Sequence, residues 1–524
     1  MAACGVLLAM VAAGLLIGPR MKPLLRERLV QVLREHYGSN VVDLQDMSVA
    51  WFFPLLRVTA DGVTLHRRGQ TDPLPLIQMQ KITIYANIRG VLKKPYRLRR
   101  IVVSGMRIHI PPRSSRDSED DHQMAASPSP AEHSLPDFIV DNVVADGTVL
   151  EIHRKKSGAE PMTWDIERLR LQSAGTNAPM KFQAVLTNAL PPGLIHSNGT
   201  FGPWEKDEPG DTPVAGTYNF KDADLSVFHG IAGILSSNGE YEGRLNRLMV
   251  NGTTDVPDFR LDVSGNRVRL KTEFAAMVDG TDGDTYLQPV NAHFLGTDLV
   301  AHGKVEGTEG VKGKTIDLAV TIRKGRVEDL VFLTTRGQPT LQGGIDVETK
   351  FELPPGNQDI MDKLNLAGKF GIASAKFASP EVGRKLGELS ARAQGRPKDA
   401  KDHAITDDTA ANFGGQFTLK DALITFSKLS FDVPGAQVNL DGTYGMRSEK
   451  LDFQGQLRMQ AKISQTQTGI KSFLLKAVDP FFQKEGAGTV LPIKITGVRD
   501  KPEFGLNFRG GSKDKKTKLA AGTE

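Results

Sequence analysis

The sequence is poor in cysteine, in aromatic residues and in net charge, and each shortage excludes a class of protein. Its single cysteine, Cys4, allows neither an intramolecular disulfide nor a cysteine-based metal site. Aromatic residues make up only 6% of the chain, so compact cores built from large rings are not indicated. The 66 basic and 61 acidic residues nearly cancel, and much of the basic excess lies in the tail at 509–524. We therefore expect no nucleic-acid partner.

Catalytic signatures are missing as well. GTEGVKGKT at 307–315 looks like a phosphate-binding loop, but Thr308 occupies the place of the first glycine and a strand pattern follows Thr315. DGTDGDTY at 279–286 lacks the spacing and terminal glutamate of a helix-loop-helix calcium site, so we interpret it as a hairpin tip. The sequence contains no HxxxH pair and no Gly-x-Ser-x-Gly elbow. We expect no enzyme, no catalytic residue, no metal site and no cofactor.

Glycine, by contrast, is abundant. The chain has 53 glycines among its 524 residues, a larger share than the roughly 7% of an average protein. Many follow Asn or Asp, and such pairs suit the two central positions of a type I′ turn, the tightest reversal of a β-strand. The sequence therefore predicts many hairpins, with candidate turns at Asp61-Gly62, Asp146-Gly147, Asn198-Gly199, Asn238-Gly239, Asn251-Gly252, Asp279-Gly280, Asp282-Gly283 and Asp441-Gly442.

An uncharged apolar run occupies residues 2–18, and a basic segment follows it. As a helix it would span roughly 25 Å, slightly less than a hydrocarbon core of about 30 Å. We predict an uncleaved membrane anchor, and a cleaved signal peptide is the alternative. Basic residues only after the run would place the body in the cytoplasm, unless the start codon is assigned too late. The anchor residues are Val6, Leu7, Leu8, Val11, Leu15, Leu16 and Ile17.

Alternation of apolar and polar residues predicts strands through most of the body. In TIDLAVTI at 315–322 every second side chain is apolar, and the same period recurs at 268–278, 345–353 and 457–463. The continuous apolar runs and crossover helices of a covered parallel sheet do not appear, so we expect a mainly antiparallel sheet with one wet face. About 25 to 30 strands at roughly 4.8 Å would make a sheet on the order of 120 to 145 Å long.

Four segments interrupt the strand pattern. Residues 22–38 form an amphipathic helical pattern, and residues 113–134 combine charge, Ser and Pro as a disordered loop does. A surface helix is predicted from about Pro380 to Ala393, followed by a polar linker. The fourth segment is an end helix within 468–482, with one apolar stripe formed by Ile470, Phe473, Leu474, Val478 and Phe481.

A sheet with one apolar face must hide that face, and two architectures do so. A set of β-sandwiches would pair two sheets over dry cores. A single curved sheet would instead form an open groove whose apolar lining receives guest acyl chains. The apolar-polar alternation is the same in both architectures, so it does not distinguish them. The low aromatic content and the small or medium size of the lining residues favour the groove.

Several segments together resemble the AsmA-like family of bacterial envelope proteins, which are related in architecture to bridge-like lipid transfer proteins. They are the apolar run, KPLLRERLVQVLREHYG at 22–38, VDLQDMSVAWFFPLLRVTADGVTLHRR at 42–68, YRLRRIVVSGMRIHI at 96–110, 414–459, and LPIKITGVRDKPEFGLNF at 491–508. The order of these degenerate motifs carries the resemblance. The departure from the family is the anchor, which no basic residue precedes.

The resemblance implies a single-pass inner-membrane protein with its bulk in the periplasm. It implies an elongated, curved, antiparallel β-groove that binds phospholipid acyl chains and supports lipid transport to, and homeostasis of, the outer membrane. An outer-membrane or periplasmic protein at the far end is a further candidate partner. The alternative function is that of a non-transporting structural or interaction protein of the envelope, built from β-sandwich modules.

These expectations define a domain organisation and a set of lining residues. The divisions are an anchor at 1–20, an amphipathic helix at 21–39, β-groove modules at 40–112 and 135–378, a disordered loop at 113–134, a helical insertion at 379–411, a C-terminal β-region at 412–508 and a disordered basic tail at 509–524. The candidate groove-lining residues are Phe259, Leu261, Val263, Val268, Leu270, Phe274, Ile316, Leu318, Val320, Ile322, Leu457, Met459, Ile463, Phe504, Leu506 and Phe508.

One motif occurs twice. Gly-x-x-Asp-x-Pro-acid-Phe-x-Leu is present at 252–261 and at 497–506. We interpret it as a structural repeat in which Gly497 and Asp500 turn the chain and Pro502 begins the next strand, where a missing N–H does least harm. The helix within 468–482 and the basic tail flank the second copy, which makes this end a candidate lipid exit.

Overall fold

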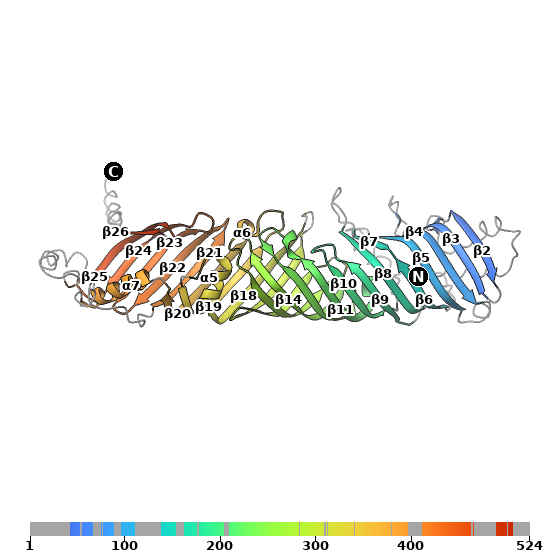
Figure 1. Cartoon of the computed structure of the whole chain (residues 1–524), viewed down its shortest axis with the longest axis horizontal. Helices are drawn as coiled ribbons and strands as arrows, with labels where there is room; N and C mark the ends of the chain where they lie inside the picture. Colours follow the sequence, from blue (N-terminus) through green and yellow to red (C-terminus); the bar gives the residue numbers. More distant parts are fainter. Residues whose placement is uncertain are drawn as a thin grey trace, which may run out of the picture.

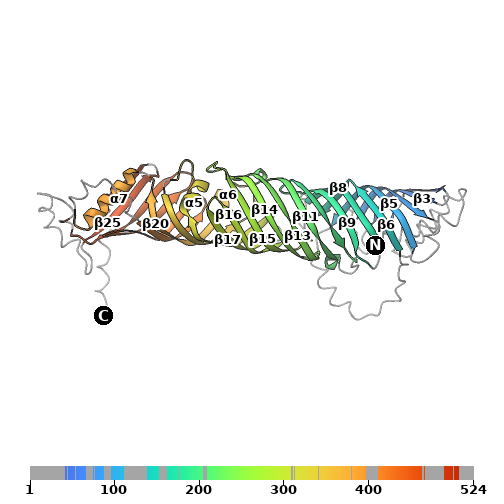
Figure 2. The same ribbon diagram turned by 60° about the horizontal axis from the view of Figure 1, so that its bottom comes forward.

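The computed structural model shows one long twisted β-sheet of 26 strands. It describes residues 42–43, 45–52, 55–65, 75, 77–87, 96–110, 138–152, 162–175, 178–203, 209–281, 283–308, 311, 313–339, 341–378, 380–396, 411–462, 465, 489–499 and 501–506. The strands follow one another along an elongated body, from the N-terminal strands at one end to the C-terminal strands at the other (Figure 1). Turned by 60°, the molecule is equally elongated, with its strands inclined to the long axis (Figure 2).

The strands are numbered in chain order. The first half comprises β1 (Val42–Asp43), β2 (Asp46–Phe52), β3 (Leu55–Leu65), β4 (Ile77–Asn87), β5 (Tyr96–Ile110), β6 (Phe138–Asp146), β7 (Thr148–Ile152), β8 (Met162–Gly175), β9 (Met180–Thr187), β10 (Leu194–Phe201), β11 (Pro213–Asp224), β12 (Ile231–Ala232) and β13 (Ile234–Arg244). The second half comprises β14 (Arg247–Leu261), β15 (Val268–Val278), β16 (Thr285–Phe294), β17 (Thr297–Gly307), β18 (Lys314–Arg326), β19 (Leu341–Leu353), β20 (Asn365–Phe377), β21 (Ala411–Lys420), β22 (Leu423–Val433), β23 (Ala436–Gly445), β24 (Lys450–Met459), β25 (Thr489–Val498) and β26 (Lys501–Leu506).

The predicted mainly β architecture and the range of strand number are confirmed. The sheet is not purely antiparallel, however, because β5 pairs in parallel with β6 and with β7. A parallel pair needs a long connection, and residues 111–137 separate β5 from β6. The loop predicted at 113–134 falls within this connection between two parallel strands, outside the described residues.

Few helices accompany the sheet in the described residues. They are α5 (Val327–Thr334), α6 (Ile360–Lys363) and α7 (Pro380–Ala393), with the short 3-10 helices η2 (Pro209–Asp211) and η3 (Leu225–Val227). The helix predicted from Pro380 to Ala393 is confirmed as α7. Sequence reasoning missed α5, because its eight residues are too few to show a clear helical period.

Many of the predicted glycine turns are wrong. Gly62, Gly199, Gly239, Gly252 and Gly442 lie inside β3, β10, β13, β14 and β23, not at hairpins. A Cβ at Gly199 would stand 2.0 Å from the carbonyl oxygen of Ala215 on the neighbouring strand. Glycine is needed here because two backbones approach closely, which a turn pattern in the sequence does not distinguish.

The repeated motif does not form a repeated structure. At the second copy, a hairpin joins β25 and β26 as predicted, but Gly497 lies within β25, where it pairs with Pro502, and β26 begins one residue before Pro502, at Lys501. At the first copy, Gly252 and Pro257 both lie within the continuous strand β14, which bulges between Val256 and Phe259. The interpretation as a common structural unit is therefore wrong, since the same residues serve as a hairpin in one place and as a bulge in the other.

Some predictions lie outside the described residues. They are the anchor at 2–18, the helix at 22–38, the end helix at 470–482, Ile463, Phe508 and the basic tail; for Phe504 and Leu506 only the backbone is described. Among the helices that are described, none combines the length and apolar composition needed to cross a membrane.

Candidate functional site

One face of the sheet is apolar from end to end. The strand registers connect a row of residues on this face, each paired with the next on the neighbouring strand. The row is Val49, Val58, Ile84, Ile101, Val143, Leu171, Phe182, Gly199, Gly216, Tyr241, Val250, Ala276, Leu287, Gly303, Leu318, Phe351, Leu366, Leu419, Ile424, Tyr444, Leu451 and Gly497. We call the surface that carries this row the apolar face. No charged residue occurs in the row.

The opposite face is polar and exposed. Ion pairs connect its strands, among them Arg323 of β18 with Glu348 of β19, and Glu348 with Lys369 of β20 at 2.7 Å. The hydrogen bond from Lys369 lowers the pKa of the Glu348 carboxyl. Pairs this exposed contribute little to stability, and their main consequence is that this face stays in contact with water.

Burial along the apolar face is uneven. Val58, Ile84 and Val140, near the N-terminal end, are almost completely buried. In the middle of the sheet, Leu318, Val320 and Phe351 are only half-buried. A half-buried row of large apolar side chains on a single sheet leaves apolar surface available for another apolar group.

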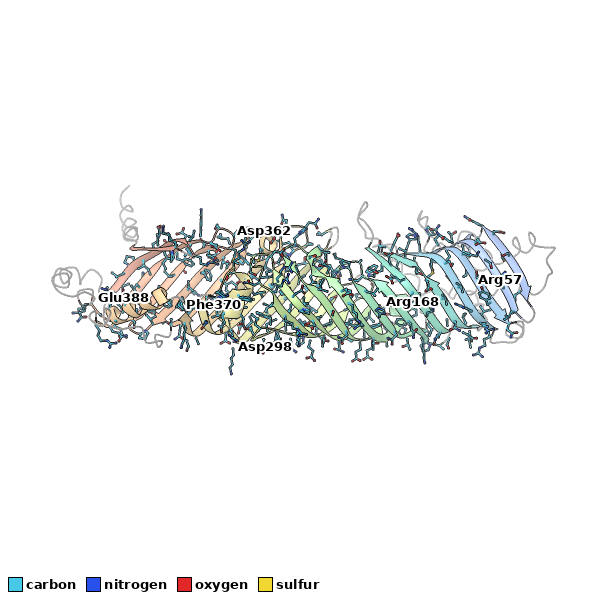
Figure 3. All side chains as sticks on the ribbon, in the orientation of Figure 1. Arg57, Arg168, Asp298, Asp362, Phe370 and Glu388 are labelled. Carbon is cyan, nitrogen blue, oxygen red and sulfur yellow. The ribbon has the colours of Figure 1, made fainter. Side chains whose placement is uncertain are left out.

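Phenylalanines concentrate on the apolar face of β20 to β24. Phe370 contacts Phe417 and Phe426 with ring centroids 6.2 Å apart in each pair, and Phe413 lies 4.6 Å from Phe431. Figure 3 shows Phe370 between the two long edges of the molecule, with Asp298 and Asp362 at the opposite edges. Sequence reasoning missed this cluster, although its alternate positions in FGGQFTLKDALITF at 413–426 were a usable signal.

The two long edges of the sheet differ. We call the edge with the connections 225–233, 262–267, 327–339 and 380–396 the helix edge, since it carries η3, α5 and α7. We call the edge with the connections 245–246, 354–364 and 446–449 the α6 edge. Leu330 and Val331 of α5 and Leu389 of α7 pack on the same cluster of the apolar face, around Ile345 and Ile372.

Polar side chains fix α5 to the helix edge. The Ser264 hydroxyl donates to the carbonyl of Leu333 at 2.7 Å, and the Asn266 amide donates to the carbonyl of Phe332 at 2.7 Å. These carbonyls belong to the last turn of α5, where no intrahelical donor remains. At the other end of α5, buried Asp329 accepts hydrogen bonds from the Gly296 N–H at 2.9 Å and the Thr297 hydroxyl at 2.8 Å.

The two edges meet in the middle of the molecule. The Ile360 N–H, at the start of α6, donates to the carbonyl of His229 on the helix edge at 3.0 Å. A Cβ at Gly230 would stand 3.1 Å from the Cβ of Ile360, so the two backbones are in direct contact. We call this contact between 229–230 and 359–360 the seam. The strands β13 to β19 lie between its two halves, so the twisted sheet is closed edge to edge around them.

Ionic contacts support the α6 half of the seam. The Asp359 side chain accepts from the Met361 N–H at 2.8 Å and so caps α6. Arg447, in the β23–β24 connection, donates to both carboxylate oxygens of Asp362 at 2.8 Å. A polar hollow beside the seam is lined from both edges, by Asp262, Val263 and Arg336 on one side and by Met361, Arg447 and Glu449 on the other.

The strand registers show on which face the predicted lining residues lie. Val268, Leu270, Phe274, Ile316, Leu318, Val320, Ile322, Leu457 and Met459 lie on the apolar face, and Phe259 pairs with Val268 there. Leu261 pairs instead with Ile231 of the short β12 at the helix edge, and Val263 follows the end of β14 and lines the polar hollow. The backbones of Phe504 and Leu506 pair with Ile495 and Ile493 in the last hairpin.

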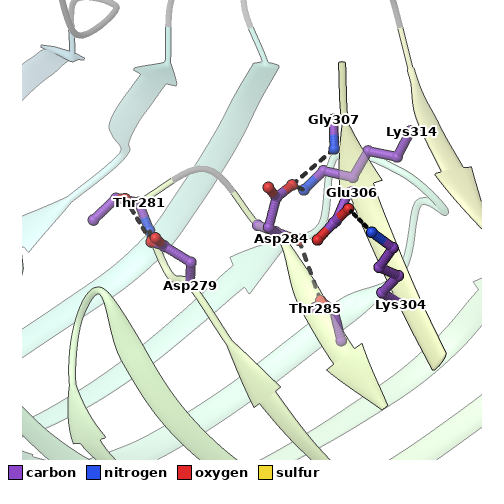
Figure 4. A network of polar contacts seen from close by, with 9 residues as sticks. Asp279, Thr281, Asp284, Thr285, Lys304, Glu306, Gly307 and Lys314 are labelled. Atoms are coloured by element: carbon purple, nitrogen blue, oxygen red, sulfur yellow. Dashed lines mark hydrogen bonds and ion pairs between the residues drawn. The ribbon is translucent and has the colours of Figure 1, made fainter. Parts of the chain in front are cut away.

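The acidic segment at 279–286 is a hairpin tip, as predicted. Asp279 accepts from the Thr281 N–H at 2.8 Å, and Asp284 accepts from the Lys314 ammonium at 2.6 Å and from the Gly307 N–H at 2.9 Å (Figure 4). These carboxylates are thus engaged with the chain itself. Within the described ranges, no group of three or more His, Cys, Asp and Glu side chains is arranged to hold a metal ion.

Comparison with protein-family models, with curated proteins and with solved structures found no match to this chain. The fold defines a mainly β protein with one long sheet, one apolar face and one wet face. The candidate site is therefore the apolar face itself, together with the seam that closes its middle.

Proposed function

We propose that this protein binds phospholipid acyl chains along its apolar face and supports lipid transport to, and homeostasis of, the outer membrane. The observation that carries the proposal is the uncharged row from Val49 to Gly497, which crosses strand after strand and is half-buried in its middle. An acyl chain moving along such a row exchanges one apolar surface for another. Leaving for water would instead cost about 0.8 kcal/mol for each CH₂ exposed.

The arrangement of the strands favours this proposal over β-sandwich modules. The 26 strands join one sheet, whereas each sandwich would need two sheets stacked over a dry core. The strand spacing of about 4.8 Å gives the sheet a length on the order of 100 Å. We further propose, from the resemblance to the AsmA-like family, a single-pass anchor in the inner membrane and a body in the periplasm.

The seam favours a second candidate function. A lipid that slides with its acyl chains on the apolar face and its headgroup in water must pass the bridge between His229 and Ile360. A bridge that never opens would stop such movement and would suit a structural or interaction protein of the envelope. The two candidates thus differ in whether lipid passes the seam.

The direct test is photo-crosslinking in living cells, with benzoylphenylalanine incorporated in the full chain at position 318 or at position 321. Leu318 lies on the apolar face, and Thr321 lies on the opposite face of the same strand, β18. We expect phospholipid adducts, identified by mass spectrometry, from position 318 and none from position 321. Equal labelling at both positions, or none at 318, would reject acyl-chain binding.

A second experiment uses substitution. Leu318→Asp or Val320→Glu places a charge on the apolar face and should abolish the phospholipid that copurifies with the full chain. Thr321→Asp adds a charge to the wet face of the same strand and should leave it unchanged. Circular dichroism spectra must be equal for the three chains, so that loss of lipid reports on binding.

A further inference from the structure

A group of hydroxyl side chains lies among the apolar residues of the apolar face. They lie on neighbouring strands from β10 to β15, next to the helix-edge half of the seam. We call them the hydroxyl band: Ser197, Tyr218, Ser237, Tyr241, Thr254 and Thr272. The registers place them on the apolar face, since Tyr241 pairs with Val250, Thr254 pairs with Ser237, and Thr272 pairs with Ala292.

Two hydrogen-bond relays with the same order form the centre of the band. The Ser197 hydroxyl donates to the carbonyl of Thr217 at 3.0 Å and lies 2.7 Å from the Tyr241 hydroxyl. A serine has one hydroxyl hydrogen, so the tyrosine must be the donor in the second contact. The Tyr218 hydroxyl donates in the same way to Ser237 at 3.1 Å, and Ser237 donates to the carbonyl of Thr253 at 3.0 Å.

Glycines make room for both tyrosines. A Cβ at Gly216 would stand 2.8 Å from the Tyr241 hydroxyl oxygen, and one at Gly252 would stand 2.5 Å from the Tyr218 hydroxyl oxygen. A Cβ at Gly239 would also lie 2.9 Å from the Tyr218 ring. The rings therefore lie along the sheet over the glycine backbones, and both tyrosines are half-buried on the apolar face.

The phenols stay protonated at neutral pH. Burial raises the pKa of Tyr218 and of Tyr241 above the usual value of 10.0, although the serine partners act in the opposite direction. Each phenol hydrogen is committed to its serine, while each phenol oxygen still has lone pairs that can accept. The relays consequently present hydrogen-bond acceptors, not donors, to whatever lies on this part of the face.

A plain hydrocarbon chain cannot use these acceptors. Covering a phenol oxygen with CH₂ groups removes water from it without giving it a new partner, which is unfavourable. An acyl chain with a hydroxyl group can donate a hydrogen bond to the same phenol oxygen, and this bond replaces the one that the oxygen made to water. The edge-to-edge closure at the seam, between His229 and Ile360, begins at the β11–β13 connection beside the band. Reduced access of water there strengthens a hydrogen bond.

We propose that the hydroxyl band is a subsite for acyl chains that carry a hydroxyl group, with Tyr218 and Tyr241 as the residues that determine the preference. The proposal rests on the acyl-chain binding proposed above and adds a chemical selection to it. The remainder of the apolar row accepts any hydrocarbon chain, and the band distinguishes among them.

The test measures the affinity of the full chain for stearate and for 2-, 3- and 12-hydroxystearate, by displacement of a fluorescent fatty acid. We expect at least one hydroxystearate to bind about fivefold more tightly than stearate, the effect of about one net hydrogen bond. In the double variant Tyr218→Phe/Tyr241→Phe, stearate and the three hydroxystearates should bind with equal affinity. Each serine keeps its bond to a backbone carbonyl, so the strands remain connected.

The controls separate this proposal from the one on which it rests. Tyr444→Phe changes a tyrosine of the same face on β23, outside the band, and should retain the preference. If wild type binds none of the four acids, acyl-chain binding itself is rejected. If it binds all four equally, or if the double variant keeps the full preference, the subsite is rejected and acyl-chain binding stands.

Discussion

The N–H of Ile360 donates a hydrogen bond of 3.0 Å to the carbonyl of His229, across the two edges of one continuous sheet. The two residues are separated in the chain by the strands β12 to β19. Each strand pair adds a right-handed twist, and over several strands this twist coils the sheet until its edges can touch. Gly230 lies at this contact with a φ of 104°, a conformation that favours glycine.

The seam can be detected by a disulfide. The pair Gly230→Cys and Ile360→Cys, in a Cys4→Ser background, should form one under mild oxidation, because a Cβ at 230 would lie 3.1 Å from that of Ile360 and a shift of a few tenths of an ångström brings the two to about the 3.5 Å of a disulfide. Gly265→Cys with Ile360→Cys is the matched control, since Gly265 also has positive φ and no atom lies within 4 Å of a Cβ there. Electrophoretic mobility with and without reductant reads out the bond. Equal oxidation of both pairs would contradict the seam.

The same disulfide addresses movement past the seam. If lipid headgroups pass between His229 and Ile360, the oxidised chain should transfer phospholipid between vesicles more slowly than the reduced chain, while crosslinking at position 318 is unchanged. Transfer that proceeds at the same rate in both states would show that lipid does not cross this point.

Mid-strand glycines should be intolerant of a methyl group where backbones approach. Gly199→Ala places a Cβ 2.0 Å from the Ala215 carbonyl oxygen, and neither atom belongs to a flexible side chain. We expect a loss of about 1–3 kcal/mol in the free energy of unfolding, as for other overpacked sites. Gly371→Ala, on β20 with nothing within 4 Å of the new Cβ, should be neutral or slightly stabilising. Thermal unfolding of both variants compares them, and equal midpoints would contradict the close approach.

We expect buried Asp329 to contribute to the stability of the fold through the hydrogen bonds that it accepts. Only 4% exposed, it is the acceptor for the Gly296 N–H and the Thr297 hydroxyl, and so connects α5 to the β16–β17 hairpin. Asp329→Ala leaves the buried Thr297 hydroxyl and the Gly296 N–H without this acceptor, at a cost of about 1–3 kcal/mol for the buried unsatisfied group. Asp317→Ala, exposed on β18, should change the unfolding midpoint little. A small effect of Asp329→Ala would show that water replaces the carboxylate.

The wet face should respond to acid through its ion pairs. The hydrogen bonds from Arg269 lower the pKa of Asp255 below its usual 3.8. A lowered carboxyl pKa adds stability that is fully present above the unfolded-state value and is lost as the pH falls through the folded-state value. Between pH 5 and pH 2, wild type should therefore lose slightly more stability than Arg269→Gln. High salt should reduce the difference, since exposed pairs are screened. An identical acid transition for the two chains would contradict the pairing.

The strands of the sheet were predictable, because alternation depends only on neighbouring residues. Ile316, Leu318, Val320 and Ile322 repeat every second position, and a strand places such residues on one face wherever it pairs. The helix from Pro380 to Ala393 was predictable for a similar local reason, since it begins with proline and is followed by a polar linker. The position of glycines such as Gly199 inside strands was not predictable. The dipeptide Asn198-Gly199 is typical of a tight turn, but here the glycine allows the close approach of the Ala215 backbone on the next strand.

The sequence by itself determined that the chain forms many strands with one apolar face, since period-two alternation is a local property. Only the tertiary structure decided that these strands join one sheet, that β5 pairs in parallel with β6, and that the edges meet at His229 and Ile360. The hydroxyl band likewise depends on register, which brings Tyr241 to Ser197 and Tyr218 to Ser237 across strands. Such contacts join residues far apart in the chain, and their positions follow from accumulated twist and pairing, which no local pattern of residues records.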